Sequence, residues 1–396
     1  MSVRPIAWLH GNLGFGGGER VLIEQIKALA PRGAPMDVLT VAASGPQDLV
    51  ADVRAASPLV RDVHPVDGTT ALSRILRRRR YEAVFTCWSL RAYRAVACLR
   101  WTPWVGRPVV IETAHERYDY AFLDHRQRRR RQVDFWVCMH DFRERVVAAF
   151  DVPLERVAVT RPLFASLLPT DTPRTREAGR RLRASLGIPA GALVVGYAGR
   201  LSGNKGLHHV IPMVARAAAG GLDVHLVVAG RRSLMTPEHG RALDEAIAAA
   251  SAPGAALAGR LHLLGALPDV HPVYGASDVV VLLSHVEGLF PLMLVEAMGH
   301  GVPVVTTDVG GIGGCLADVR DAAVVEKIPD DARDPTPEVL TAFERRLHAV
   351  LCDPGERARL GDAGRRRVET LVGENDFHGD TRAAYDRALS LGRMRR

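Results

Sequence analysis

Short apolar runs alternate along the whole chain with polar stretches that have helical spacing. The runs are continuous Val/Ile/Leu segments, which indicates strands buried on both faces, as in a parallel sheet with crossover helices. The pattern predicts an α/β protein with two Rossmann-like, doubly wound parallel-sheet domains. The expected strands are residues 5–10, 36–41, 81–87, 108–115, 135–140 and 157–160 in the first half, and 192–199, 224–230, 261–267, 278–284, 303–309 and 322–328 in the second.

The length of 396 residues suits two domains of roughly 150–200 residues each. The stretch at 167–182 is rich in proline, threonine and charge, and we interpret residues 171–185 as the linker between a domain at 1–170 and a domain at 186–374. Residues 375–396 have helical spacing, and we expect a helix that returns to the first domain. The two domains are expected to face a cleft, with ligands at the carboxyl ends of the strands.

Composition is that of a soluble globular protein, with 47% hydrophobic and 24% charged residues. No apolar run approaches the roughly 18–20 residues that span a bilayer, and the first residues lack a signal-peptide pattern. We therefore expect a cytoplasmic protein. The five cysteines are scattered and form no Cys-x-x-Cys pair, so neither a disulfide framework nor a zinc site of that type is expected.

Positive charge is concentrated in the first half of the chain. Residues 1–180 hold 28 Lys+Arg against 19 Asp+Glu, while the net charge of the whole chain is +8. Two arginine runs, at 74–80 and 126–131, account for much of this excess. Each is either a solvated helix face or a surface for an anionic acceptor or an acidic membrane leaflet, which would place the protein peripherally at the inner face of the membrane. Nucleic acid is not expected, because no aromatic residues interleave with the arginines.

A glycine-rich turn follows the first expected strand. That strand ends at His10, and an amphipathic helix begins at about Gly18. Glycines such as Gly16 and Gly17 let backbone amides approach an anion, and a helix N-terminus adds a partial positive charge. Because the spacing does not match the dinucleotide fingerprint, a tight turn that needs small residues is the alternative interpretation.

Two cations lie on a second strand-to-helix loop. The chain has only three lysines, and one of them, Lys205, follows Arg200 in this glycine-flanked loop. The planar guanidinium suits two phosphate oxygens, and the compact ammonium reaches a diphosphate with rotatable donors. Together they would neutralise a leaving diphosphate without a metal; two solvated loop cations are the alternative.

Two carboxylates follow a later strand. Glu287 lies in the loop after the strand that ends at Ser284, and Glu296 lies on the next helix, for which Pro291 suits the first turn. A carboxylate accepts hydrogen bonds from two vicinal hydroxyls, as on a sugar or a ribose. A further glycine pair at 310–311 predicts another loop that approaches a ligand closely.

These motifs, in this order, resemble the family-4 retaining glycosyltransferases of the GT-B fold. The resemblance covers nearly the whole chain and implies transfer of a hexose from a nucleotide diphosphate sugar, of the GDP-mannose or UDP-hexose type, to a hydroxyl acceptor. A glycan, a glycolipid, a lipid-linked or anionic acceptor, or a small natural-product aglycone fits, and no cofactor is implied. It rests on GGGERV (16–21), TAHE (113–116), GRLSGNKGL (199–207), LVVAGR (226–231), LLGALPDVHPVYGASDVVVLLS (263–284) and EGLFPLMLVEAMGHGVPVV (287–305).

The resemblance also implies a role for each matched residue. Arg200 and Lys205 would hold the donor diphosphate, Glu287 would contact the transferred sugar, and Glu296 would contact the ribose. His115 would lie near the sugar on the acceptor side. The other expected contributors to substrate binding are Gly16, Gly17, Arg231, Gly288, Leu289 and Phe290.

The chain departs from the family pattern in one respect that bears on activity. Eight residues separate Glu287 from Glu296, where the family usually has seven, and we place the extra residue before the helix. An inactive partner that binds nucleotide sugar, or a sugar-nucleotide epimerase, is therefore the alternative to an active transferase. No metal site is expected: no Asp-x-Asp or His-Glu-x-x-His occurs, and the adjacent His208 and His209 would diverge on a helix.

Overall fold

The computed structural model divides the chain into two compact units. Unit 1 is Met1–Pro162 together with Asp376–Arg396, and unit 2 is Leu163–Asn375. The structure describes residues 3–14, 16–41, 48–87, 90–99, 107–114, 132–139, 146–147, 151–169, 172–233, 236–285, 287, 291–310, 312, 316, 323–325 and 334–393. Among these residues, no helix is long and apolar enough to cross a membrane.

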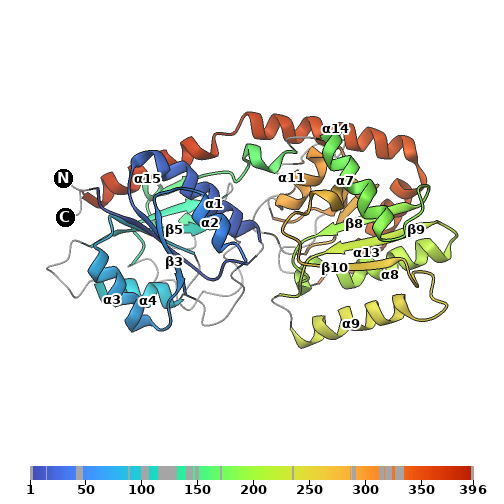
Figure 1. Cartoon of the computed structure of the whole chain (residues 1–396), viewed down its shortest axis with the longest axis horizontal. Helices are drawn as coiled ribbons and strands as arrows, with labels where there is room; N and C mark the ends of the chain where they lie inside the picture. Colours follow the sequence, from blue (N-terminus) through green and yellow to red (C-terminus); the bar gives the residue numbers. More distant parts are fainter. Residues whose placement is uncertain are drawn as a thin grey trace. The chain divides into compact units, whose positions relative to one another are not determined.

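Unit 1 is built on a parallel sheet with helices on both faces (Figure 1). Its described strands lie in the order β3 (Val60–Pro65), β2 (Met36–Thr40), β1 (Ile6–His10), β4 (Ala83–Thr86), β5 (Val109–Ala114), β6 (Phe135–Cys138) and β7 (Val157–Val159). The covering helices are α1 (Gly17–Leu29), α2 (Val50–Ala55), α3 (Thr69–Arg79), α4 (Leu90–Leu99) and α15 (Phe377–Arg393).

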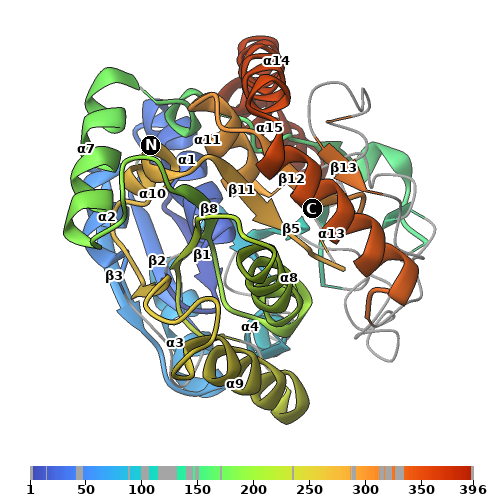
Figure 2. The same cartoon turned by 90° about the vertical axis from the view of Figure 1, so that its right-hand side faces the viewer.

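Unit 2 repeats this architecture. Its described strands lie in the order β10 (Leu261–Gly265), β9 (Val224–Ala229), β8 (Leu193–Ala198), β11 (Val279–Leu282), β12 (Val304–Thr307) and β13 (Ala323–Val325), all parallel. The strands lie between α11 on one side and α8 on the other (Figure 2). The helices are α7 (Thr172–Ser185), α8 (Leu207–Ala219), α9 (Pro237–Ser251), α10 (His271–Ala276), α11 (Leu292–Gly299), α13 (Pro337–Cys352) and α14 (Pro354–Gly373).

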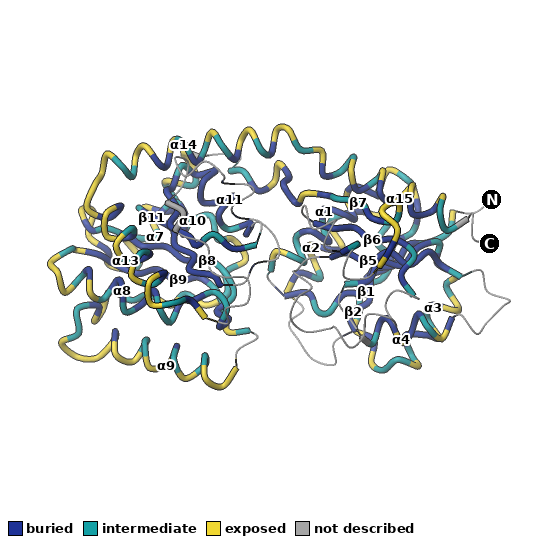
Figure 3. The backbone as a smooth tube through the Cα atoms, turned by 180° about the vertical axis from the view of Figure 1, so that it is seen from behind, coloured by how far each residue is buried: buried dark blue, intermediate teal, exposed yellow. Residues whose placement is uncertain are grey.

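The burial of each strand explains whether its apolar run could be recognised in the sequence. The central strands are buried along their length, whereas the outer faces of helices such as α9 are exposed (Figure 3). The expected strand positions are confirmed in both units, but strand β3 is absent from the sequence prediction. It lies at an edge of the sheet, only Val63 of its residues is buried, and charged Arg61 and Asp62 interrupt its apolar positions.

Helix α15, which lies last in the sequence, packs within unit 1. Its Tyr385 is 1% exposed and stacks on Phe85 of β4 with ring centroids 6.1 Å apart, and Phe85 stacks on Trp8 of β1 at 5.0 Å. A second contact joins His378 Nε2 to Glu24 Oε2 of α1 at 2.8 Å. Burial of these aromatic rings makes α15 a part of the unit 1 core.

The segment interpreted as a linker is a helix. Residues Thr172–Ser185 form α7, which packs against α10 inside unit 2. A Cβ on Gly179 would lie 2.1 Å from the backbone of Gly275, so the two helices touch backbone to backbone. The composition was misleading because proline suits the start of a helix and arginine is a good helix former.

The arginine run at 74–80 has two kinds of member. Arg74, Arg77 and Arg78 are exposed on α3. Arg79 instead pairs with the fully buried Asp37 at 2.9 Å and with Asp62 at 2.6 Å. One cation of the run therefore stabilises the interior of unit 1. The second run, at 126–131, lies outside the described residues.

Candidate functional site

The sheet order of unit 2 brings two loops together. Strands β8 and β11 are neighbours, with Val195 opposite Val279, although helices and two other strands separate them in sequence. From β8 the chain continues to β9 and β10 toward one edge of the sheet, and from β11 it continues to β12 and β13 toward the other edge. The β8–β11 pair is therefore the topological switch point of the sheet. In open parallel sheets ligands bind at the carboxyl ends of the strands at such a point. The loop after β8 carries Arg200 and Lys205, and the loop after β11 carries Glu287.

Lys205 and Glu287 form an ion pair at this point. The Lys205 ammonium donates a hydrogen bond to Oε1 of Glu287, and the two side chains are only 14% and 9% exposed. Lys205 ends a single 3₁₀ turn, Gly203–Lys205, so its position is fixed by the turn. An ammonium has three donors, and the pair with Glu287 leaves two for other oxygens.

The turn is anchored to the neighbouring loop through its backbone. The Asn204 carbonyl accepts hydrogen bonds from the His285 amide at 3.0 Å and from the Ser284 hydroxyl at 2.8 Å. Gly206 follows with φ of 67°, and a Cβ there would lie 2.0 Å from the Leu283 carbonyl oxygen. Only glycine fits at this position, since it combines a left-handed backbone with close approach of Leu283, the residue after β11.

Glu287 is also approached from the loop after β12. Gly310 has φ of 59°, and a Cβ there would lie 2.0 Å from the Glu287 carbonyl oxygen. This close contact explains a glycine at the position where the sequence predicts a close-approach loop. The loop after β12 therefore contacts the backbone of Glu287.

Arg200 offers a second cation beside Lys205. Its backbone carbonyl accepts a hydrogen bond from the buried Tyr197 hydroxyl at 2.7 Å, which fixes the loop after β8. The half-buried guanidinium makes no hydrogen bond or ion pair with any residue that the structure describes. Burial, then the charge of Glu287, raises the pKa of Tyr197, so this tyrosine is a neutral hydroxyl donor at physiological pH.

Glu296 lies on α11 and is held by a tyrosine. The carboxylate is 3% exposed and accepts a hydrogen bond from the Tyr274 hydroxyl of α10 at 2.7 Å. Next to it, His271 Nδ1 lies 2.7 Å from Nε2 of the buried His300. Burial, and to a smaller extent His271, lowers the pKa of His300 to about 4. Sequence reasoning missed these three residues because no spacing marks them; they meet only in the folded unit.

The remaining predicted residues fall into three groups. Arg231 follows β9, and its carbonyl accepts the Leu201 amide at 2.9 Å, so the structure places it beside the loop of Arg200. Gly16 and Gly17 lie in unit 1 at the start of α1, where Glu19 folds back over Gly16. Four predicted residues lie outside the described ones: His115, Gly288, Leu289 and Phe290.

Unit 1 has its own cavity at the corresponding switch point, between β1 and β4. It is lined by residues that include His10, Gln25, Thr86 and Thr113. His10 Nδ1 lies 2.7 Å from the Asn12 carbonyl, which places its proton there and leaves a lone pair on Nε2. Neither His10 Nε2 nor Gln25 Nε2 has a hydrogen-bond partner among the described residues. The described lining of the cavity thus includes one unpaired acceptor, on His10, and one unpaired donor group, on Gln25, which match a single hydroxyl group.

The two units define the GT-B fold, and solved structures share it. Anabaena HepE in complex with UDP-glucose superposes with a TM-score of 0.70 at 18% identity, over 96% of this chain and 98% of its own. A glycosyltransferase from Rickettsia africae has a TM-score of 0.69 at 15% identity, over 99% of both chains. At these identities the likeness establishes the fold.

Residues 192–340 match the family model described as glycosyl transferases group 1. This match covers the strands and loops of unit 2 that carry Arg200, Lys205, Glu287 and Glu296. Among known proteins, a D-inositol 3-phosphate glycosyltransferase of Corynebacterium urealyticum is 28% identical over 58% of this chain and 51% of its own length. A 2-deoxystreptamine glucosyltransferase of Streptomyces kanamyceticus is 29% identical over 54% and 50%. The chain thus spans about half the length of these relatives.

Proposed function

We propose that the protein is a retaining glycosyltransferase that moves a hexose from a nucleotide diphosphate sugar to a hydroxyl acceptor without a metal at the diphosphate. The observation that carries this proposal is the buried pair of Lys205 and Glu287 at the switch point of unit 2, in the same loop as the Arg200 guanidinium, which has no partner among the described residues. The match of this unit to the group 1 glycosyl transferases and the names of the relatives support the reaction class.

Each charged group has a task in this reaction. The Arg200 guanidinium and the two remaining donors of Lys205 bind diphosphate oxygens, where negative charge grows as the bond to the sugar breaks. Because Glu287 holds the Lys205 ammonium and Tyr197 holds the backbone of Arg200 before the donor arrives, little reorganisation of the two loops is needed in the transition state. Glu287, held by Lys205, accepts hydrogen bonds from sugar hydroxyls, and Glu296 accepts them from the ribose.

The chemistry requires one bond to form and one to break on the same face of the sugar. The acceptor oxygen attacks the anomeric carbon as the carbon–oxygen bond to the diphosphate breaks, and the departing diphosphate takes the acceptor proton. The configuration at the anomeric carbon is then retained. His115 and the Gly16–Gly17 turn are assigned to this reacting region on the resemblance alone.

The acceptor is assigned to unit 1. The cavity of His10 and Gln25 presents an acceptor and a donor for one hydroxyl, at the carboxyl ends of β1 and β4. A polyhydroxylated acceptor such as a glycan, a glycolipid or an aminocyclitol-like aglycone provides such a group. An anionic or lipid-linked acceptor would also contact the exposed arginines of α3 and bring the protein to a membrane surface.

A donor panel tests the proposal. The protein is incubated with UDP- and GDP-hexoses and with sugar and cyclitol acceptors, and nucleoside diphosphate release is followed over time. We expect release that depends on acceptor, a product whose anomeric configuration by NMR equals that of the donor, and at least a tenfold weaker donor affinity for Arg200→Ala. Arg232→Ala, which removes an exposed pair with Asp244, is the matched control. Binding without turnover would show an inactive partner, and donor conversion without acceptor would show an epimerase.

A further inference from the structure

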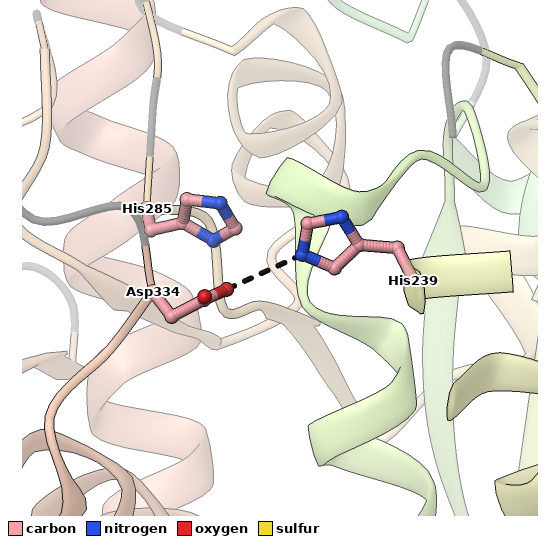
Figure 4. Close-up of side chains that lie close together, drawn as sticks. All are labelled: His239, His285 and Asp334. Atoms are coloured by element: carbon pink, nitrogen blue, oxygen red, sulfur yellow. Dashed lines mark hydrogen bonds and ion pairs between the residues drawn. The ribbon is translucent and has the colours of Figure 1, made fainter. Parts of the chain in front are cut away.

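Two histidines and one aspartate converge beside the turn that carries Lys205. His239 comes from α9, His285 from the loop after β11, and Asp334 from the segment before α13. Each offers one ligand atom, and these atoms all lie within 4.8 Å of one another. The rings of both histidines point toward the Asp334 carboxylate (Figure 4). All three residues belong to unit 2.

The separation of two of these atoms equals that of ligands on a metal. His239 Nε2 lies 3.3 Å from Asp334 Oδ1, and bonds of about 2.0–2.1 Å at a tetrahedral angle place two zinc ligands about 3.3 Å apart. The other imidazole nitrogen of His239 lies 3.0 Å from the Thr236 hydroxyl. This contact allows Nδ1 to hold the proton, so that Nε2 presents a lone pair to the shared space.

A buried, unpaired nitrogen of His285 is a second observation that indicates a ligand at this cluster. The residue is 7% exposed, and its Nδ1 has no hydrogen-bond partner among the residues that the structure describes. Leaving a buried polar atom unpaired costs roughly 1–3 kcal/mol. An ion bound at Nδ1 would supply the missing partner of this buried atom.

We propose that His239, His285 and Asp334 bind one divalent transition-metal ion of the zinc class, with a water molecule completing the coordination. Two imidazoles and a carboxylate suit zinc, whereas magnesium and calcium prefer sites made of oxygen ligands. This assignment does not depend on the proposed transfer reaction.

The ion would brace the Gly203–Lys205 turn from two directions. The His285 amide already donates to the Asn204 carbonyl at 3.0 Å, and a Cβ on Gly203 would lie 2.5 Å from the ring of His239. Two of the three ligands therefore contact the turn directly. Metal binding would fix the turn that ends at Lys205. The ion would thus position this lysine and would take no part in bond breaking.

Metal titration of the full chain tests the site without any substrate. Metal-free protein is titrated with Zn²⁺ by calorimetry and with Co²⁺ by visible absorption, and the melting temperature is measured with and without Zn²⁺. We expect one ion per chain, ligand-field bands of a low-coordinate Co²⁺ site, and a higher melting temperature with Zn²⁺ but not with Mg²⁺. Asp334→Asn and His239→Gln should each weaken Zn²⁺ binding at least about 100-fold, because losing a ligand costs more than losing its outer hydrogen-bond partner.

His262→Gln is the matched control. His262 Nε2 lies 3.1 Å from His225 Nδ1 in the same unit, with no carboxylate in the contact, so this variant should bind Zn²⁺ as the wild type does. Asp334 and His239 are the partly exposed ligands, which makes their variants compatible with folding. The proposal is overturned if the wild type binds no Zn²⁺ below about 100 µM, or if Asp334→Asn and His239→Gln bind it with wild-type affinity.

Discussion

Lys205 and Glu287 lie 82 positions apart in sequence and meet in a nearly buried ion pair at the switch point of unit 2. Removing one member of such a pair leaves the other as an uncompensated buried charge, which destabilises proteins by about 3–5 kcal/mol. The stability of the site and its chemistry are therefore coupled through the same two side chains. Variants must separate the two effects.

Lys205→Ala is expected to lower kcat by about 150- to 1000-fold, because a preorganised charge donor contributes about 3–4 kcal/mol to the transition state. Lys205→Arg should recover only part of the rate, since the planar guanidinium does not fit the tight turn. The double variant Lys205→Met/Glu287→Gln should regain the stability lost by Lys205→Met but none of its activity. Donor kinetics and urea unfolding of all four proteins check this; full activity of Lys205→Arg would contradict it.

His10→Ala is expected to raise the KM for the acceptor at least fivefold while leaving donor affinity unchanged. The residue provides the lone pair of the unit 1 cavity, whereas the donor is assigned to unit 2. Acceptor kinetics at saturating donor and nucleotide-sugar binding by calorimetry give the two readings. Thr381→Ser, a small change at another buried polar residue of unit 1, is the control. Equal loss of both affinities would assign His10 to folding alone.

Chelation is expected to leave most of the transfer rate at 20 °C, because Arg200 and Lys205 provide the positive charge at the diphosphate. The metal-free enzyme should melt at a lower temperature, and Zn²⁺ alone should restore it. Rates and melting curves are measured after EDTA treatment and after addition of each metal. Complete loss of activity that Mg²⁺ or Mn²⁺ restores would show a metal at the diphosphate and contradict the proposed mechanism.

Stability is expected to fall as the pH drops from 6.5 toward 4. Burial lowers the pKa of His285 and of His300 to about 4 in the folded protein, whereas an unfolded histidine titrates near 6.5. Between these values the unfolded chain binds more protons, so the free energy of unfolding decreases by up to about 1.4 kcal/mol per pH unit for each residue. Urea unfolding of the metal-free protein at pH 7.5, 6.0 and 5.0 measures the slope. His300→Gln should make it shallower, and an unchanged slope would place the effect elsewhere.

Replacing Arg74, Arg77 and Arg78 together by glutamine tests the arginine run of α3. These side chains are exposed, whereas Arg79 holds buried Asp37 and is left intact. If the run meets an anionic surface, affinity for vesicles with acidic lipid should fall, at ~1 kcal/mol per cation, with no change in melting temperature. Vesicle co-sedimentation at two salt concentrations reads this out. Identical sedimentation would identify the run as a solvated helix face.

The sequence predicts the fold where burial is uniform. Strands such as β8 and β11 are buried on both faces, so their apolar runs stand out, whereas edge strand β3 carries charges and is missed. The presumed linker is α7, because proline and arginine in this segment favour a helix that composition alone disguises. Local pattern thus identifies a buried element more readily than an exposed one.

Most predicted residues of the candidate site in unit 2 lie where a loop follows a strand, and Glu296 lies on the helix after such a loop. Arg200, Lys205 and Glu287 stand at strand ends, and both the resemblance and the switch-point rule select them. That Lys205 touches Glu287 depends on the order of strands in the sheet, which no single segment encodes. The same holds for His239, His285 and Asp334, which have no common spacing and meet only through tertiary structure.

The interrupted course of unit 1 has a consequence for biosynthesis. Its sheet is translated first, but α15, whose Tyr385 closes the aromatic stack on Phe85 and Trp8, is translated after the whole of unit 2. Unit 2 is one continuous segment and can complete its core on the ribosome as soon as α14 has emerged. Until α15 has been made, the surface of α1 that α15 contacts in unit 1 stays uncovered. The half of the protein that is made first therefore matures last.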